Sequence, residues 1–284
     1  ECAPDWVYSE LDGYRIGFNG QRIGPHHHGA FYPGGWLPCF DNPGVRKATA
    51  AYVTEIAARY ADHPALWFYN AWNEPRSRPL GQCQCKHSQV LYREWLHSKF
   101  GPIENLNKAL GKQWMSYDTV FPPTDAFDYV QMYLWRLWAA DMVASHVKLV
   151  NDAIKAGDPK AFVMTHVGGC TVIQDTCFDA SDDLANSAVV DRYGTSYPVN
   201  LHPKSIIEHC AGDYISDWLR RVDPDYWCHE FYTNNGCWSI PPEPEVLNRL
   251  VWQAISGGTA GFTFWQYRSE RVGNETNGWG MRNI

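Results

Sequence analysis

The chain has 284 residues, with 24 lysines and arginines against 31 aspartates and glutamates, so its formal net charge is −7. This length is enough for one large domain with a substantial core, and the acidic balance offers no basic surface to a nucleic-acid backbone. Aromatic residues make up 15% of the chain, including 14 tryptophans, and flat rings also suit the faces of sugars.

No apolar run of about 18 residues is present, so we predict no membrane partner and no membrane span. The first ten residues lack the basic start and apolar stretch of a signal peptide. Nine cysteines at irregular spacing do not form a recognisable disulfide framework. We leave the compartment open, with a cytoplasmic location favoured over secretion.

Residues 1–45 are rich in glycine, proline, histidine and aromatic residues, and this composition predicts long loops. A helix is predicted from Asn42, with Pro43 in its first turn, to residues 62–64. Its apolar positions are Val45, Ala48, Tyr52, Ile56 and Tyr60. The continuous apolar run 65–72 then predicts a strand that is buried on both faces.

Further helices are predicted over residues 88–100, 103–110 and 126–156. The last of them has an apolar stripe formed by Phe127, Val130, Leu134, Leu137, Met142 and Leu149. Short strands over 161–167, 188–193, 226–231 and 260–266 then alternate with helical or loop segments near 179–186, 203–221 and 243–256. This alternation predicts a parallel sheet of five strands with crossover helices.

Two glutamates lie where predicted strands end. Glu74 follows the run 65–72, and Glu230 closes a strand in which His229 and Tyr232 flank it. Because the carboxyl ends of parallel strands meet on one face of a barrel, we expect both carboxyls there. Glycoside hydrolysis needs two carboxyl groups, one to donate a proton and one to attack the sugar or activate water. A single such glutamate could instead cap a helix or pair with an arginine, but two together favour catalysis.

Several motifs occur in an order and spacing that resemble the β-galactosidases of glycoside hydrolase family 42. They are WNEP, CQCKHS, YREWLHSKFGPIENLN and FPP from Trp72 onward, then DRYGTSYP, CHEFYTNNGCW and FWQYRSERVGNETNGWG at 191–198, 228–238 and 264–280. The resemblance implies an α/β fold of the (β/α)8 TIM-barrel type. It also implies that Glu74 is the acid/base at the end of strand four and Glu230 the nucleophile at the end of strand seven.

By the same resemblance the five predicted strands become strands four to eight of the barrel. We therefore expect residues 1–284 to form a single catalytic barrel domain that is truncated at both ends, with the N-terminal strands missing. Five strands cannot close an eight-stranded barrel.

The resemblance also implies residues that bind the sugar. Asn73 should contact the hydroxyl next to the reacting carbon, and Trp238 should line the sugar site, although a core position is its alternative. Glu275 resembles the family's glutamate that holds galactose hydroxyls, but Gly278 stands where a histidine is expected, which weakens the case for galactose. The remaining predicted sugar contacts are Tyr197, Tyr232 and His166.

Family members hold a structural zinc ion with four cysteines, and this chain has three of them, Cys39, Cys83 and Cys85. The fourth position is Ser88, a poor zinc ligand, with His87 beside it as a substitute that a tetrahedral site accepts. The alternative is a loop of free thiols that has lost its metal. No cofactor is expected for catalysis itself.

The resemblance implies double displacement with retention of configuration, and carboxyl groups about 5 Å apart. Two alternatives remain open: a cellulase-like retaining endo-glycanase of a related barrel family, and a carbohydrate-binding barrel that has lost turnover. The expected partner is a carbohydrate substrate, with no nucleic acid, and a homotrimer is implied by the family only.

Overall fold

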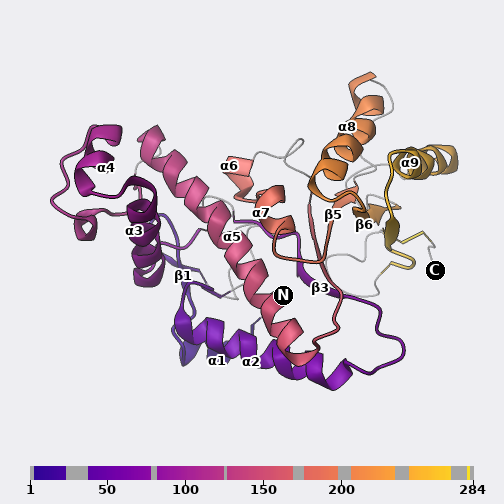
Figure 1. The fold of residues 1–284 in the computed structure, drawn as a ribbon, viewed down its shortest axis with the longest axis horizontal. Helices are drawn as coiled ribbons and strands as arrows, with labels where there is room; N and C mark the ends of the chain where they lie inside the picture. The colour runs from indigo at the N-terminus through magenta and orange to yellow at the C-terminus, as the bar shows by residue number, and fades with distance from the viewer. Residues whose placement is uncertain are drawn as a thin grey trace. The chain divides into compact units, whose positions relative to one another are not determined.

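A computed structural model of the chain describes residues 3–23, 38–77, 82–124, 127–168, 176–197, 206–233, 243–269 and 280–281 (Figure 1). The chain divides into two compact units. Unit 1 comprises the described residues within Glu1–Asp62, Arg76–Pro159 and Thr176–Asp182, and unit 2 those within His63–Pro75, Lys160–Asp175 and Asp183–Ile284. The single barrel domain over residues 1–284 stays a prediction.

Unit 2 is built on a parallel sheet of five strands that pair in sequence order. The strands are β3 (Tyr69–Asn73), β4 (Val163–Val167), β5 (Arg192–Tyr197), β6 (Trp227–Tyr232) and β7 (Gly261–Trp265). Parallel strands that neighbour one another in chain order, with crossovers between them, are the arrangement of a (β/α) barrel. The predicted parallel sheet of five strands is confirmed among the described residues.

One strand lies later in the chain than predicted. The prediction placed it over 188–193 because Ala188, Val189 and Val190 form an apolar run, but these residues follow α7 (Asp183–Ser187), and the backbone N–H groups of Ala188 and Val190 donate to Leu184 and Ser187. The strand itself has the sequence RYGTSY, in which five consecutive residues are buried although several are polar. Because buried polar side chains interrupt the strand, it does not form the apolar run by which buried strands are predicted.

Irregular pairing in two strands determines which side chains share a face. Between Thr195–Ser196 on β5 and Cys228–Glu230 on β6, the second strand has one extra residue, which is His229. On β3, the step from Asn70 to Asn73 matches a step of only two residues on β4. Such bulges redirect the side chains that follow them and are frequent beside active sites.

The helices of unit 2 are α7, α8 (Ile206–Val222) and α9 (Pro244–Ser256). Residues of α8 and α9 and the outward-facing residues of β5 and β6 form one buried core. Its largest fully buried side chains are Tyr193, Tyr197, Ile215, Tyr226 and Phe231. The predicted helices near 203–221 and 243–256 are thus confirmed for the part that the structure describes.

Unit 1 begins with a short helix and a hairpin where long loops were predicted, so that prediction is wrong for residues 5–23. The elements are α1 (Asp5–Ser9), β1 (Arg15–Ile16) and β2 (Arg22–Ile23), and the two strands are antiparallel. Each strand has only two residues, too few for a periodic pattern to be visible in the sequence.

The helices described in unit 1 after α1 are α2 (Pro43–Tyr60), α3 (Lys86–Phe100), α4 (Ile103–Leu110), α5 (Tyr129–Gly157) and α6 (Thr176–Asp179), and a 3₁₀ turn lies at Tyr117–Thr119. Asn42 caps α2 as predicted, since its side-chain oxygen accepts hydrogen bonds from the backbone of Gly44 and Val45. Among the described residues no helix is long and apolar enough to cross a membrane.

The buried faces of α2 and α5 differ from the predicted stripes. On α2, Tyr52 is 67% exposed and the buried residues are Val45 and Ala57. Gly157 of α5 packs here, and a Cβ at this position would lie 2.2 Å from the carbonyl oxygen of Thr54. On α5, the predicted Phe127 and Val130 are exposed, and the buried stripe includes Trp135, Trp138, Val143, Val147, Val150 and Ile154. Small residues let the two helices approach closely, so bulk alone does not identify the buried face.

Candidate active site

Glu74 directly follows β3 and has a left-handed backbone, with φ of +46°. A residue other than glycine adopts such a conformation at a cost of about 1–3 kcal/mol, and such strain is concentrated at functional sites. The preceding Asn73 pairs with His166 of β4 in the sheet register. The chain thus turns abruptly at the strand end, with the half-buried Glu74 directly after Asn73.

Glu230 lies on β6 directly after the bulged residue His229 and opposite Ser196 of β5. Its side chain is 13% exposed, so the carboxylate is largely withdrawn from water but still accessible. Because the bulge interrupts strict alternation, His229 and Glu230 can both approach His166 on β4.

Two hydroxyl groups bridge the carboxylates of Glu74 and Glu230. The Ser196 hydroxyl oxygen lies 3.0 Å from Glu74 Oε1 and 3.3 Å from Glu230 Oε2. The Tyr232 hydroxyl lies 3.1 Å from the same oxygen of Glu230 and 3.4 Å from the same oxygen of Glu74. The distance between the two carboxylate oxygens is therefore no greater than the sum of two hydrogen-bond lengths.

Two histidines pack beside Glu230. The Nε2 atom of His166 is 3.5 Å from Glu230 Oε1, and this imidazole is fully buried. Its ring centre lies 4.5 Å from that of His229, whose Nδ1 is 3.3 Å from the Thr263 hydroxyl. The nucleophile candidate therefore contacts an imidazole through one oxygen and hydroxyl groups through the other.

The surroundings of Glu230, His229 and Tyr232 shift the pKa values of all three side chains. Burial by itself raises the pKa of Glu230, but the His166 imidazole 3.5 Å away and the hydroxyl of Tyr232 together hold that pKa below its usual value. Burial, reinforced by the neighbouring His166, lowers the pKa of His229 to about 3, so this imidazole is neutral at neutral pH. Burial and the two nearby carboxylates raise the pKa of Tyr232, which keeps its hydroxyl a donor.

The predicted sugar contacts separate into three groups. Tyr232 and His166 lie against the carboxylates. Tyr197 lies on the opposite face of β5, fully buried and stacked on Phe231 with ring centres 5.1 Å apart. Trp238, Glu275 and the nearby Gly278 lie outside the described residues.

Ser196 was not predicted. Side chains alternate along a strand, so extending the predicted strand 188–193 to residue 197 would have placed either Ser196 or Tyr197 on the face of Glu230. The predicted strand ended at residue 193, so this alternation was not available for residues 196 and 197.

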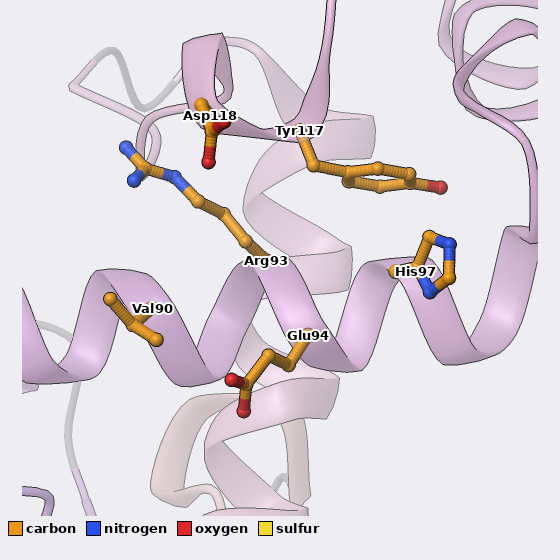
Figure 2. Close-up of a pocket in the computed structure, with 6 residues that line it drawn as sticks. All are labelled: Val90, Arg93, Glu94, His97, Tyr117 and Asp118. Carbon is orange, nitrogen blue, oxygen red and sulfur yellow. The ribbon is translucent and has the colours of Figure 1, made fainter.

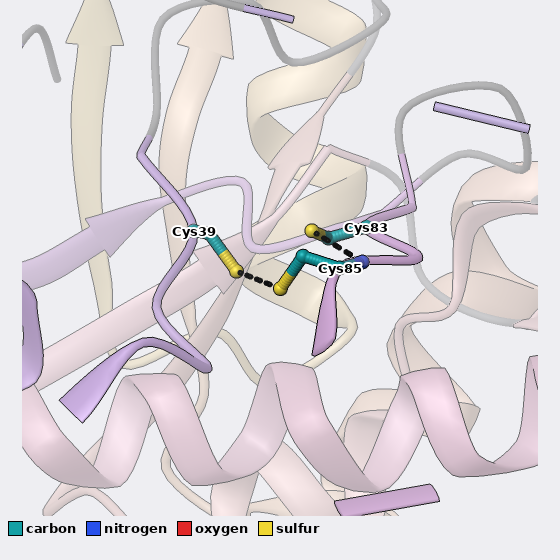
Figure 3. A group of neighbouring side chains, drawn as sticks. All are labelled: Cys39, Cys83 and Cys85. Carbon is teal, nitrogen blue, oxygen red and sulfur yellow. Dashed lines mark hydrogen bonds between the residues drawn. The ribbon is translucent and has the colours of Figure 1, made fainter. Parts of the chain in front are cut away.

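Cys39, Cys83 and Cys85 form a second group, in unit 1, with their sulfur atoms within 4.8 Å of one another (Figure 3). The Sγ atoms of Cys39 and Cys85 are 3.6 Å apart, and Cys83 Sγ accepts a hydrogen bond from the backbone of Cys85. Two thiolates on a tetrahedral zinc ion, each about 2.3 Å from the metal, lie roughly 3.8 Å apart. The three cysteines therefore fit such an ion.

Ser88 is the fourth group around these sulfurs. Its hydroxyl oxygen is 3.5 Å from Cys85 Sγ and 3.8 Å from Cys39 Sγ, and it donates to Asp41 over 2.5 Å. His146 contacts the other oxygen of Asp41 at 3.0 Å. His87 is not among the potential ligands that gather here.

A surface hollow in unit 1 contains none of these residues. It lies along α3 and is lined by Val90, Arg93, Glu94, His97, Tyr117 and Asp118 (Figure 2). It is open and shallow, and its carboxylates come with no bridging donors of the kind found between Glu74 and Glu230. The candidate catalytic site is therefore the pair of carboxylates at the strand ends of unit 2.

A family model and curated relatives show the family of the chain. The model of glycoside hydrolase family 42, described as beta-galactosidase, matches residues 35–283. A β-galactosidase of Halorubrum lacusprofundi is 29% identical over 259 residues, which are 86% of this chain and 35% of that protein. One of Clostridium cellulovorans is 23% identical over 292 residues, which are 96% of this chain and 41% of that protein.

Solved structures show the fold. The polyextremophilic β-galactosidase from Halorubrum lacusprofundi superposes with a TM-score of 0.81 at 22% identity, covering 99% of this chain and 44% of that one. The five-stranded sheet is therefore part of a (β/α)8 barrel, as predicted. The chain spans between 35% and 44% of the length of the relatives named here.

Proposed function

Because the chain belongs to glycoside hydrolase family 42, the β-galactosidase family whose model matches residues 35–283, we propose that it is the catalytic part of a retaining glycoside hydrolase. Its substrates are terminal β-D-galactosides or related β-glycosides. Glu74 is the general acid/base and Glu230 the nucleophile. The observation that carries the proposal is the pair of carboxylates bridged by Ser196 and Tyr232.

The reaction proceeds in two displacements. A carboxylate oxygen of Glu230 attacks the anomeric carbon while Glu74 gives its proton to the departing glycosidic oxygen, so the carbon–oxygen bond breaks and an ester forms. Water then attacks the same carbon, Glu74 takes the water proton, and the Glu230 carboxylate leaves. Two inversions at one carbon give net retention.

The spacing of the carboxylates supports retention over inversion. Retaining enzymes place the two groups about 5–5.5 Å apart, whereas inverting enzymes leave about 6.5–9.5 Å for a water molecule. A single serine hydroxyl within hydrogen-bond distance of both groups favours the shorter spacing. The lowered pKa of Glu230, produced by His166 and Tyr232 against the effect of burial, suits a nucleophile that must be ionised.

Sugar selection is assigned to the residues that the family resemblance implies. Asn73, directly before Glu74, contacts the hydroxyl next to the reacting carbon, and Trp238 and Glu275 bind the remainder of the ring. The glycine at position 278 leaves the sugar less restricted than in relatives with a histidine. A structural zinc ion held by Cys39, Cys83 and Cys85, and assembly into a homotrimer, belong to the same proposal.

The test combines stereochemistry with substitution in the full-length protein. Proton NMR of the hydrolysis of an aryl β-galactoside, with the β-glucoside in parallel, should show the β-anomer of the sugar as the first product. Glu230→Ala and Glu74→Ala should each lower kcat/KM by at least about a thousandfold. Glu55→Gln, on the exposed surface of α2, is the matched control and should leave kcat/KM unchanged. An α-anomer as first product, or an active Glu230→Ala variant, contradicts the proposal.

A further inference from the structure

Ser196 reaches both carboxylates but has no access to solvent. Its residue is fully buried, and it faces Glu230 across the β5–β6 ladder. The hydroxyl lies 3.0 Å from one carboxylate and 3.3 Å from the other. Because it is fully buried, the Ser196 hydroxyl does not contact the sugar. It acts through its contacts with the two glutamates.

Double displacement moves negative charge between these same two glutamates. Before the first step Glu230 is a carboxylate and Glu74 carries the acid proton. In the glycosyl-enzyme Glu230 is a neutral ester, and Glu74 is the charged base that accepts a proton from water. A hydrogen bond to a charged acceptor is about twice as strong as one to a neutral acceptor, so a donor is most useful where the charge resides.

We propose that Ser196 is a positioning residue whose hydroxyl donates to Glu230 in the free enzyme and to Glu74 in the glycosyl-enzyme. This inference rests on the proposed function. Because the serine oxygen already lies within hydrogen-bond distance of both acceptors, the change requires only rotation about the carbon–oxygen bond of the hydroxyl. The donor is thus preorganised for both transition states without reorganisation of the sheet.

Tyr232 reaches the same two oxygens but differs from Ser196 in its surroundings. It is only partly buried and lies two residues after Glu230 on the same strand, so its hydroxyl is also available to a sugar. Among the described residues, the other titratable groups beside Glu230 are His166 of β4 and His229 of β6. Removal of Ser196 takes one of the two hydroxyls away from Glu74 and leaves the Tyr232 hydroxyl at 3.4 Å.

The experiment measures the two steps separately in the full-length protein. An aryl β-glycoside with a poor leaving group reports the first step, and a dinitrophenyl β-glycoside, which needs no acid assistance to depart, reports hydrolysis of the glycosyl-enzyme through kcat. Ser196→Ala should slow both steps by about ten- to a hundredfold. The acid limb of its kcat/KM profile should move upward by about one pH unit, because Glu230 loses a donor to its charged form.

Two further variants control for structure. Ser196→Thr keeps a hydroxyl and should retain most of the activity and the pH profile. Ser216→Ala removes another fully buried serine hydroxyl of unit 2, which contacts Tyr226 at 3.0 Å, and should leave both rates unchanged. If Ser196→Ala does not fold, Ser196→Cys, with its similar size and weak donor, is judged by the same criteria.

The possible results have separate meanings. A folded Ser196→Ala or Ser196→Cys variant with normal rates in both steps overturns the inference, and so does a loss confined to one step, because the hydroxyl then serves one carboxylate only. An unaltered protein that hydrolyses no aryl β-glycoside overturns the proposed function first, and the inference with it.

Discussion

At the scale of single residues, the ionisation of Glu230 is determined by opposing effects. Burial disfavours its charge, while His166 at 3.5 Å and the hydroxyl of Tyr232 favour it, and these two neighbours prevail because the pKa lies below its usual value. His166 therefore favours the ionised form of the nucleophile.

Replacement of His166 should accordingly change the pH dependence more than the maximal rate. In His166→Asn, burial remains while the imidazole is gone, so the pKa of Glu230 rises. The acid limb of kcat/KM, which reports groups of the free enzyme, should then move upward by about one pH unit or more. At pH values well above that limb, kcat/KM should fall less than at pH values below it.

The matched control is His97→Asn, which removes an exposed histidine of α3 in unit 1. Its pH profile should coincide with that of the unaltered protein. If His166→Asn leaves the acid limb in place while its fold is intact, His166 has no part in ionising Glu230.

The residue pair Glu74 and Glu230 could be predicted from the sequence because Glu74 follows one apolar strand and Glu230 lies near the end of another. Ser196 could not, since the buried RYGTSY strand contains polar residues and has no apolar pattern. Burial of Tyr197 in the helix-facing core follows from strand alternation, but only once the strand is correctly bounded. The two glutamates could thus be predicted from the sequence, whereas the buried Ser196 between them could not.

At the scale of elements, the cysteine group joins three segments of unit 1. Cys39 precedes α2, Cys83 accepts a hydrogen bond from the backbone of Ile16 in β1, and Cys85 is the residue directly before α3. Hydrogen bonds to Cys39 and Cys83 lower the pKa of Cys85. A metal ion at this point would hold the hairpin and two helix starts together.

We expect one zinc ion per chain, bound at this group. Cys39→Ala should abolish binding and lower Tm by about 5–10 °C, as for a ligand present at roughly a hundred times its Kd. Ser88→Cys, which adds a fourth thiolate, should slow the loss of zinc to a chelator. Metal analysis and thermal unfolding measure both effects.

Cys210→Ala is the control for these variants, because Cys210 is an exposed cysteine of α8 and lies in unit 2. It should change neither zinc content nor Tm. A purified protein without zinc, whose Tm is the same with and without added metal, would leave the cysteines as free thiols.

Helix positions were predicted more accurately than helix faces. The predicted ranges 88–100 and 103–110 agree with α3 and α4 to within two residues, since a glycine ends each helix, Gly101 and Gly111. The buried stripe of α5 contains Trp135 and Trp138 but not the predicted Phe127. Close packing at Gly157 and Ala57 selects the face, and this depends on a partner helix distant in sequence.

At the scale of the whole molecule, the five strands are unequally covered. All residues of β4 are buried, whereas all residues of β3 and β7 are half-buried or exposed. Trp67, just before β3, is 73% exposed and Phe264 of β7 is 39% exposed. Among the described residues, these outer strands have a neighbour on one side only.

Hydrogen exchange should reflect this difference. In the 284-residue chain, amides of β4, β5 and β6 should be protected far more strongly than those of β3 and β7, which lie at open edges. In the full-length protein the outer strands should gain protection if other segments close the barrel. Equal protection of all five strands in the 284-residue chain would contradict the description of β3 and β7 as open edges.

The central claim is that Glu230 forms a covalent bond to the sugar. The most direct measurement is mass spectrometry of proteolytic peptides after treatment of the full-length protein with an aryl 2-deoxy-2-fluoro-β-galactoside, whose glycosyl-enzyme is hydrolysed slowly. We predict a single sugar adduct on the peptide that contains Glu230, absent from Glu230→Ala. An adduct on another carboxylate, or turnover of unfluorinated substrate with no adduct at all, would contradict the account.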